Sequence, residues 1–215
     1  MSITKKLIGI LGGSFDPIHT GHTQVATQVL QHFNFDRIDF VPNFIPACNK
    51  ILSCSAEHRS SMVALAIEHT PKFHLNLIEL NRKGPSKTID TLRELRKRHP
   101  QDALAFIMGE DSYNTIDEWH NYEQFLDLCH LIVVKRNHNK NRISKLARAL
   151  YKQHYQEDKN LLKIQSNGII MSYNLINLKT SSTEIRSTIG AGMQSVDLAP
   201  QVSRYIEKNG LYTPS

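Results

Sequence analysis

Residues 12–22 read Gly-Gly-Ser-Phe-Asp-Pro-Ile-His-Thr-Gly-His, and the expected fold can be built outward from this stretch. The apolar run before it, residues 7–11, has the length and branching of a buried parallel strand. After it, residues 25–33 can continue as a helix. The stretch is therefore predicted to form the turn between a strand and a helix.

The backbone of this turn suits an anion. Gly12 and Gly13 carry no Cβ, so the chain there can adopt positive φ and let a bulky anion approach its N–H groups. Ser14 adds a hydroxyl group. If the helix begins near Thr20, its free N–H groups and its positive dipole end point to the same place. Together these features predict a phosphate site, whereas a glycine pair alone is more often a simple turn.

Two histidines of the turn can add hydrogen bonds. His19 and His22 lie three residues apart, so on one helical turn their imidazoles share a face and can both donate toward one phosphate. Two donors aimed at one point suit charge that grows on phosphorus. The alternatives are surface histidines or zinc ligands, but none of the 11 histidines supplies a recognisable third ligand for zinc.

Strands alternate with helices along the rest of the chain. Strands are expected at residues 37–42, 73–77, 103–108, 131–134 and 169–178. Helices are expected at residues 56–69, 88–99, 143–155, 182–190 and 199–208, and a loop at 43–55. This rhythm predicts a Rossmann-like α/β fold, an open and mostly parallel sheet with helices on both faces and ligands beyond the carboxyl ends of the strands. We expect one domain over residues 1–215, with a small C-terminal helical part at about 181–215.

Composition narrows the class of protein only partly. The net charge of +6 favours anionic partners, but it fits a nucleotide-binding enzyme as well as a nucleic-acid binder. Three cysteines without Cys-x-x-Cys spacing predict neither a disulfide framework nor a zinc site, and favour a reducing cytoplasm. No apolar stretch approaches the roughly 18 residues of a membrane helix, so no membrane partner is expected. The basic face of the helix at 88–99, formed by Arg93, Arg96, Lys97 and Arg98, is expected to be solvated surface rather than a binding site.

A second candidate anion site lies near the end of the chain. The common P-loop and dinucleotide motifs are absent, and Ser14 lies in no Gly-x-Ser-x-Gly motif. At Ser181, Ser182 and Arg186, however, a Ser-rich helix start is followed by a guanidinium group. This pattern can be a plain helix cap, or it can be an anion cradle of hydroxyls, N–H groups and a planar cation.

Both ends of the chain carry a family resemblance. Residues 12–22 resemble the first signature of the nucleotidylyltransferase superfamily, and specifically that of nicotinate-nucleotide adenylyltransferases. Residues 180–186 are similar to the second signature, with Thr180 in place of the usual Ile. Residues 86–92 resemble the family's Ser-x-Thr-x-Asp-Thr-Leu stretch, although Lys87 stands where the family commonly has an aromatic residue.

Five further matches lie between these stretches of the chain. Gly109 and Asp111 match the Gly-x-Asp of the family, and Trp119 matches its ring-stacking position, with a core role as the alternative. Of the family's loop ending in Pro-Pro-His-Lys, only Lys50 of the last three residues is kept. Arg59 and Arg136 also match family positions, and for each a surface role is the alternative.

The resemblance implies a reaction and a set of site residues. AMP would pass from ATP to nicotinate mononucleotide, giving deamido-NAD and pyrophosphate, with Mg²⁺ bound to ATP and no metal held by the protein. The implied catalytic residues are His19, His22, Lys50 and Arg186. The implied ATP-binding residues are Gly12, Gly13, Ser14, Phe15, His19, Gly21, His22, Gly109, Asp111, Ser181, Ser182 and Arg186. The implied mononucleotide-binding residues are Ser14, Lys50, Ser86, Thr88, Trp119 and Arg136.

Other functions stay open at this stage. The same signatures serve adenylyl transfer to nicotinamide mononucleotide or phosphopantetheine, and cytidylyl transfer. The basic stretches at 93–99 and 135–163 could instead belong to a nucleic-acid-binding module, although no aromatic-rich RNA-binding signature accompanies them. Sequence also leaves open the oligomeric state, the preference for the acid or the amide mononucleotide, and whether the loop at 43–55 closes over substrate.

Overall fold

A parallel sheet forms the centre of the protein. The computed structural model describes residues 5–47, 51–135, 143–176 and 180–213. Within them a six-stranded sheet has the order β4-β2-β1-β6-β7-β8, and every pairing in it is parallel. The strands are β1 Leu7–Gly13, β2 Arg37–Pro42, β4 Phe73–Leu75, β6 Ala103–Gly109, β7 His130–Lys135 and β8 Ile170–Asn174. A separate parallel pair joins β3 Ile45–Pro46 to β5 Pro85–Ser86.

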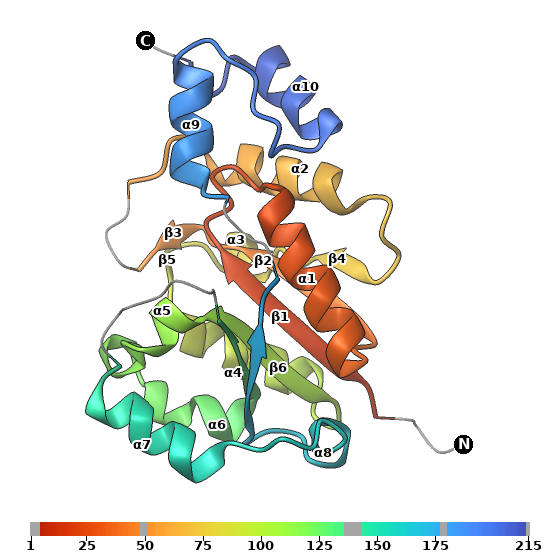
Figure 1. Cartoon of the computed structure of the whole chain (residues 1–215), viewed down its shortest axis with the longest axis vertical. Coiled ribbons are helices and arrows are strands. Elements are labelled where there is room, and N and C mark those ends of the chain that lie inside the picture. The colour runs from red at the N-terminus through yellow and green to blue at the C-terminus, as the bar shows by residue number, and fades with distance from the viewer. Residues whose placement is uncertain (1–4, 48–50, 136–142, 177–179, 214–215) are drawn as a thin grey trace.

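Helices cover both faces of the sheet (Figure 1). One layer holds α1 Thr20–Phe33, α2 Ala56–Ile67 and α10 Pro200–Lys208, and the other holds α4 Thr88–Arg98, α6 Phe125–Leu128 and α7 Lys145–His154. The remaining elements are α3 Ile78–Arg82, α5 Glu110–Tyr113, α8 Leu161–Ile164, α9 Ser182–Gly190 and the 3₁₀ helices η1 Ile116–Glu118 and η2 Tyr122–Gln124. Among the described residues, no helix combines the length and apolar character that crossing a membrane requires.

Each face of the sheet has its own core, because side chains alternate along a strand. In β1, Leu7 and Leu11 pack into the cluster that contains residues of α1, α2 and α10, whereas Ile8 and Ile10 pack into the cluster with α4, α6 and α7. Central strands buried on both faces must be apolar throughout, which is why the sequence shows them as continuous apolar runs.

The predicted fold class is confirmed, and the order of strands locates the ligand site. The order in which the chain adds strands to the sheet reverses between β1 and β6. From β1 the chain adds β2 and β4 on one side, and it then returns to the other side of β1 to add β6, β7 and β8. In open α/β sheets this switch point opens a crevice beyond the carboxyl ends of the two strands. Gly13 and Gly109, the last residues of β1 and β6, therefore border the expected site.

The element boundaries differ from the sequence predictions in a few places. The predicted strand at 73–77 ends at Leu75, and within the described part of the predicted strand at 169–178, which extends to residue 176, β8 covers Ile170–Asn174. The predicted loop at 43–55 contains the short strand β3. The short helices α3, α5, α6 and α8 were not predicted, because four or five residues carry too little periodicity to signal a helix.

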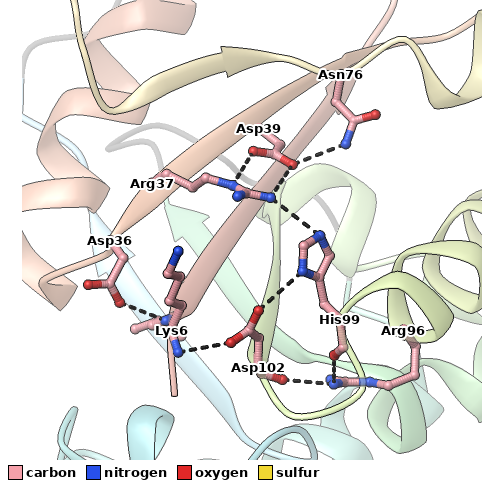
Figure 2. A network of polar contacts seen from close by, with 9 residues as sticks. Lys6, Asp36, Arg37, Asp39, Asn76, Arg96, His99 and Asp102 are labelled. Carbon is pink, nitrogen blue, oxygen red and sulfur yellow. Dashed lines mark hydrogen bonds and ion pairs between the residues drawn. The ribbon is translucent and has the colours of Figure 1, made fainter. Parts of the chain in front are cut away.

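A polar network joins the loops at the amino ends of the strands (Figure 2). Arg37 donates to Asp39 at 2.8 Å and lies 3.4 Å from the ring of His99, whose other nitrogen lies 3.1 Å from Asp102. Arg96 donates to the carbonyl oxygens of His99, Asp102, Leu128 and Ser166 at 2.7–3.0 Å. Within the basic face, Lys97 and Arg98 are exposed as expected, whereas Arg96 is half-buried and ties α4 to neighbouring loops.

A buried histidine makes the stability of the fold depend on pH. His130, at the start of β7, is fully buried and its Nδ1 accepts the N–H of Ile169 at 3.2 Å. Since Nδ1 accepts, the neutral ring carries its proton on Nε2, which lies 3.4 Å from the carbonyl oxygen of Gln165. Burial lowers the pKa of His130 from 6.5 to about 4.

We expect this pKa difference to destabilise the protein in mild acid. The unfolded chain binds the proton below pH 6.5, whereas the folded chain binds it only near pH 4. The stability that the neutral, buried His130 contributes to the fold is therefore fully present above pH 6.5 and is lost as the pH falls toward 4. At 1.36 kcal/mol per pKa unit, this loss in the free energy of unfolding is roughly 3 kcal/mol. Urea unfolding between pH 4 and 7 should show a shallower fall for His130→Asn, which keeps an acceptor but cannot titrate. Equal slopes for the two proteins would contradict the prediction.

Candidate active site

The turn between β1 and α1 has a tight, unusual backbone. Phe15 adopts a φ of 47°, while neither Gly12 nor Gly13 is among the residues with positive φ. The expectation of positive φ at the glycines is therefore wrong. Gly13 is needed for another reason: a Cβ there would lie 3.3 Å from the ring of Phe15, which folds back under the turn into the core. The turn thus brings its backbone, rather than side chains, to the end of β1.

The two histidines of the turn lie together. His19 is the N-cap of α1, its backbone N–H donates to Nδ1 of His22 at 3.2 Å, and the two rings stack with centroids 3.7 Å apart. Both imidazoles therefore share one face, as their spacing predicts. Because Nδ1 of His22 accepts a hydrogen bond, the neutral ring carries its proton on Nε2 and can donate only from that nitrogen.

The second signature reaches the first one in space. Arg186, on α9, donates from Nη1 to the carbonyl oxygen of Asp16 at 2.7 Å, and Ser182 donates from Oγ to that of Pro17 at 3.1 Å. Ser181 is the N-cap of α9, and its Oγ accepts the N–H of Glu184 at 3.2 Å. Residues about 165 positions apart thus meet, and the start of α9 adjoins the turn that leads into α1.

A buried carboxylate holds this turn to the C-terminal segment. Asp16 is 2% exposed, and its oxygens accept from Tyr212 Oη at 2.8 Å, from the N–H of Ser53 at 2.8 Å and from Cys54 Sγ at 3.3 Å. Burial raises the pKa of Cys54 to about 11, so its thiol stays protonated and donates at neutral pH. Neither Asp16 nor Tyr212 is a predicted site residue, because nothing in their spacing signals this contact.

We expect Tyr212→Phe to destabilise the protein by about 1–3 kcal/mol, because it removes a donor from a buried carboxylate. Urea unfolding at pH 7 measures this loss. Tyr205→Phe is a matched control, since that hydroxyl lies 3.0 Å from Nδ1 of His58 and contacts no carboxylate of the turn. A loss for Tyr212→Phe no larger than that for Tyr205→Phe would show that Asp16 does not depend on this hydroxyl.

A buried arginine fixes the other side of the turn. Arg59, on α2, has no exposed surface, and burial lowers the pKa of its guanidinium group. It donates to the carbonyl oxygens of Ser14 at 2.6 Å, Asn43 at 2.7 Å and Phe44 at 3.1 Å. The alternative of a surface role for Arg59 is wrong. Its fork instead joins the turn after β1 to the segment after β2.

A cavity of about 730 Å³ opens beside this turn. It collects residues from the ends of β1, β2 and β6, from the β5–α4 junction and from the segment after α5. Of the predicted site residues, those that line it are Gly12, Gly13, Ser14, Ser86, Thr88, Asp111 and Trp119. Trp119 also packs edge-on against Phe106 and Phe125. Its ring therefore both lines the cavity and packs against the hydrophobic core that contains these two residues.

The other predicted site residues lie elsewhere. Phe15 is buried in the core and Gly21 is buried in the first turn of α1. The residues that do not line the cavity are Phe15, His19, Gly21, His22, Gly109, Ser181, Ser182 and Arg186. Lys50 and Arg136 lie outside the described residues. The predicted site therefore has two parts. One is the cavity, and the other is the region after Ser14 where the N-termini of α1 and α9 lie next to each other.

Comparisons with known proteins identify the family. The Cytidylyltransferase-like family model matches residues 10–188. A probable nicotinate-nucleotide adenylyltransferase of Psychromonas ingrahamii is 37% identical over 99% of this chain and 100% of its own length, and one of Serratia proteamaculans is 38% identical over 97% and 96%. The chain belongs to the nicotinate-nucleotide adenylyltransferase family. The family, the enzyme class and the function predicted from the sequence are thereby confirmed at the family level.

A solved structure of similar fold supports the architecture. The nicotinic acid mononucleotide adenylyltransferase of Plasmodium falciparum, in complex with NaAD, superposes with a TM-score of 0.71 at 23% identity, over 96% of this chain and 97% of the other. At this identity the likeness speaks for the Rossmann-like fold alone, which agrees with the parallel sheet described above.

Within this member of the adenylyltransferase family, two acidic residues that line the cavity, Glu79 and Glu118, are not among the predicted site residues, and Glu79 is the buried one. Glu79 is 7% exposed, and its Oε1 accepts from Thr91 Oγ1 at 2.6 Å. Burial raises the pKa of Glu79, and hydrogen bonds from Ser86 and Thr91 partly offset that rise. Ser86 in turn accepts the N–H of Phe44 at 2.8 Å. Glu79 therefore holds the two hydroxyl-bearing segments that form one wall of the cavity.

Over the part of the chain that the structure describes, no group of three or more His, Cys, Asp and Glu residues is arranged to hold a metal ion. The paired rings of His19 and His22 therefore belong to no such cluster of described residues.

Proposed function

We propose that this protein transfers AMP from ATP to nicotinate mononucleotide, releasing pyrophosphate and forming deamido-NAD. The observation that carries the proposal is the cavity, in which Ser14, Ser86, Thr88 and Trp119 line one space beside the β1–α1 turn. An aromatic wall suits a pyridine ring, and hydroxyl groups near paired glycines suit a sugar phosphate. The names of the relatives support the same reaction.

In this proposal the mononucleotide phosphate is the nucleophile. One of its oxygens forms a bond to the α-phosphorus of ATP while the bond from that phosphorus to the bridging oxygen breaks, and the electron pair leaves with pyrophosphate. The acceptor is already ionised, so the protein contributes positioning and charge stabilisation. We assign His19 and His22 to the α-phosphate and bridging oxygens, and Lys50 to the reacting groups.

The start of α9 is proposed to bind the β- and γ-phosphates. Ser181, Ser182 and Arg186 supply hydroxyl and guanidinium groups beside the α1 start. Arg186 uses Nη1 for the Asp16 carbonyl and Nη2 for Thr183 Oγ1, and a guanidinium has five N–H donors. Donors of Arg186 therefore remain for phosphate oxygens without loss of the contact to the turn.

Magnesium enters the proposal with ATP. Since the described residues offer no ligand cluster of their own, Mg²⁺ is proposed to be held by phosphate oxygens of the nucleotide. Bound there, it spreads the negative charge of the triphosphate. We also propose that the chain works as one domain, because the C-terminal segment hydrogen-bonds to the N-terminal turn. A cytoplasmic location stays a prediction.

The test is pyrophosphate release by the purified full-length protein with ATP and Mg²⁺. Nicotinate mononucleotide, nicotinamide mononucleotide and phosphopantetheine are compared as acceptors, and CTP is compared with ATP as donor. We expect the highest kcat/KM with ATP and nicotinate mononucleotide. Higher kcat/KM with another pair would assign the protein to that reaction. Tight, steeply salt-dependent binding to DNA or RNA without pyrophosphate release would instead support a nucleic-acid-binding module.

A further inference from the structure

The charges around the cavity are unevenly distributed. Its lining includes the acidic residues Glu79, Asp111 and Glu118, and one Lys or Arg, Lys87, among the residues that the structure describes. His120 is a further lining residue. Glu79 lies 4.0 Å from the guanidinium group of Arg82, so its charge is partly compensated within the wall. The substrate of the proposed function carries both a phosphate and a pyridine carboxylate, and a fixed positive charge in the wall attracts such groups.

Lys87 is placed to provide that charge. It is the N-cap residue of α4, it immediately follows Ser86, and it is half-buried on the same wall as Thr88. Its ammonium group forms no ion pair with another described residue, so it is not neutralised by the acidic residues of the cavity. The α4 start adds the positive end of a helix dipole in the same direction.

We propose that Lys87 is a specificity-determining residue that favours the acid form of the pyridine mononucleotide, by attracting its ring carboxylate. The inference rests on the proposed function and adds a reason for the choice between acid and amide. Both substrates share the ribose phosphate and the ring, and only the acid carries the second negative group. A charge near the ring therefore separates the two substrates, whereas a charge near the phosphate treats them alike.

Turnover by the full-length protein tests this distinction. Lys87→Gln should lower kcat/KM for nicotinate mononucleotide about five- to tenfold, mainly through KM, and change the value for nicotinamide mononucleotide by less than about twofold. Lys87→Arg should retain most of the preference. Lys83→Gln is the matched control, because Lys83 is exposed, lies four residues earlier and does not line the cavity.

Binding can be followed without turnover. Trp119 is the only tryptophan and lines the cavity, so its fluorescence reports binding of either mononucleotide in the absence of ATP. We expect the Kd of the acid to rise about five- to tenfold in Lys87→Gln, with a weaker dependence on salt than in the unchanged protein.

The outcomes separate this inference from the proposed function. Equal losses for acid and amide in Lys87→Gln would overturn it and place the lysine near the phosphate. A preference for the acid over the amide that is the same in Lys87→Gln as in the original protein would also overturn it. In either case, turnover of nicotinate mononucleotide by the original protein would leave the proposed function standing. If the unchanged protein turns over neither mononucleotide, the proposed function itself is overturned, and the role of Lys87 with it.

Discussion

His22→Ala is expected to lower kcat for pyrophosphate release at least about a hundredfold while the fold stays intact, because it removes a donor from developing charge at phosphorus. The structure restricts that donor to Nε2, since Nδ1 of His22 accepts the N–H of His19 at 3.2 Å. Steady-state kinetics with saturating ATP, Mg²⁺ and nicotinate mononucleotide measures the effect. Near-normal turnover by the alanine variant would refute the proposed role.

Two further variants separate catalysis from the helix cap. The amide of His22→Asn can keep an acceptor near the Nδ1 position but offers no donor near Nε2, so it should keep the stability and lose the turnover. His22→Gln can place a donor near Nε2 but loses the acceptor, so it should regain about tenfold in kcat relative to alanine and lose about 0.5–2 kcal/mol of stability. The opposite ranking in kcat would assign the catalytic effect to the cap of α1 rather than to the Nε2 donor.

Local patterns explain why much of the fold was predictable. The strand at the start of the chain, the helix that begins at Thr20 and the helix at residues 182–190 each carry their own signals: an apolar run, a glycine-rich turn and a serine cap. The segment between β6 and β7 carries none, and there the chain forms short helices, with the ring of Trp119 packed against Phe106 of β6 and Phe125 of α6. Such elements follow from tertiary contacts and not from periodicity.

The candidate site shows the same division. His19, His22, Ser182 and Arg186 were found because they lie in short contiguous motifs, and the structure brings the two motifs together. Asp16 was missed in its structural role because its partner Tyr212 lies 196 residues away. The cavity residues Ser86, Thr88 and Trp119 came from the family resemblance, since their spacing alone would equally describe a loop, a helix start and a core residue.

Arg59→Met is expected to lower the free energy of unfolding by about 2–4 kcal/mol, because three backbone carbonyl oxygens lose their donor at once. The affected carbonyls belong to Ser14, Asn43 and Phe44, and the first two of these residues line the cavity. We therefore also expect kcat/KM to fall about ten- to a hundredfold in the fraction that stays folded, through misplacement of the turn. Urea unfolding and pyrophosphate release measure the two effects separately.

The expected loss of stability in Arg59→Met is this large because of the geometry of the guanidinium group. Arg59→Lys keeps the charge, but a single ammonium group on a flexible stem cannot reproduce a planar fork that reaches three carbonyls in two loops, so it should recover only part of the stability. Arg98→Met on the exposed side of α4 is the control, and its effect should stay within about 0.5 kcal/mol. Arg59→Lys could instead match the original protein in both stability and kcat/KM. The positive charge of residue 59 would then hold the turn, and the proposal that the three carbonyl contacts position the two loops would be wrong.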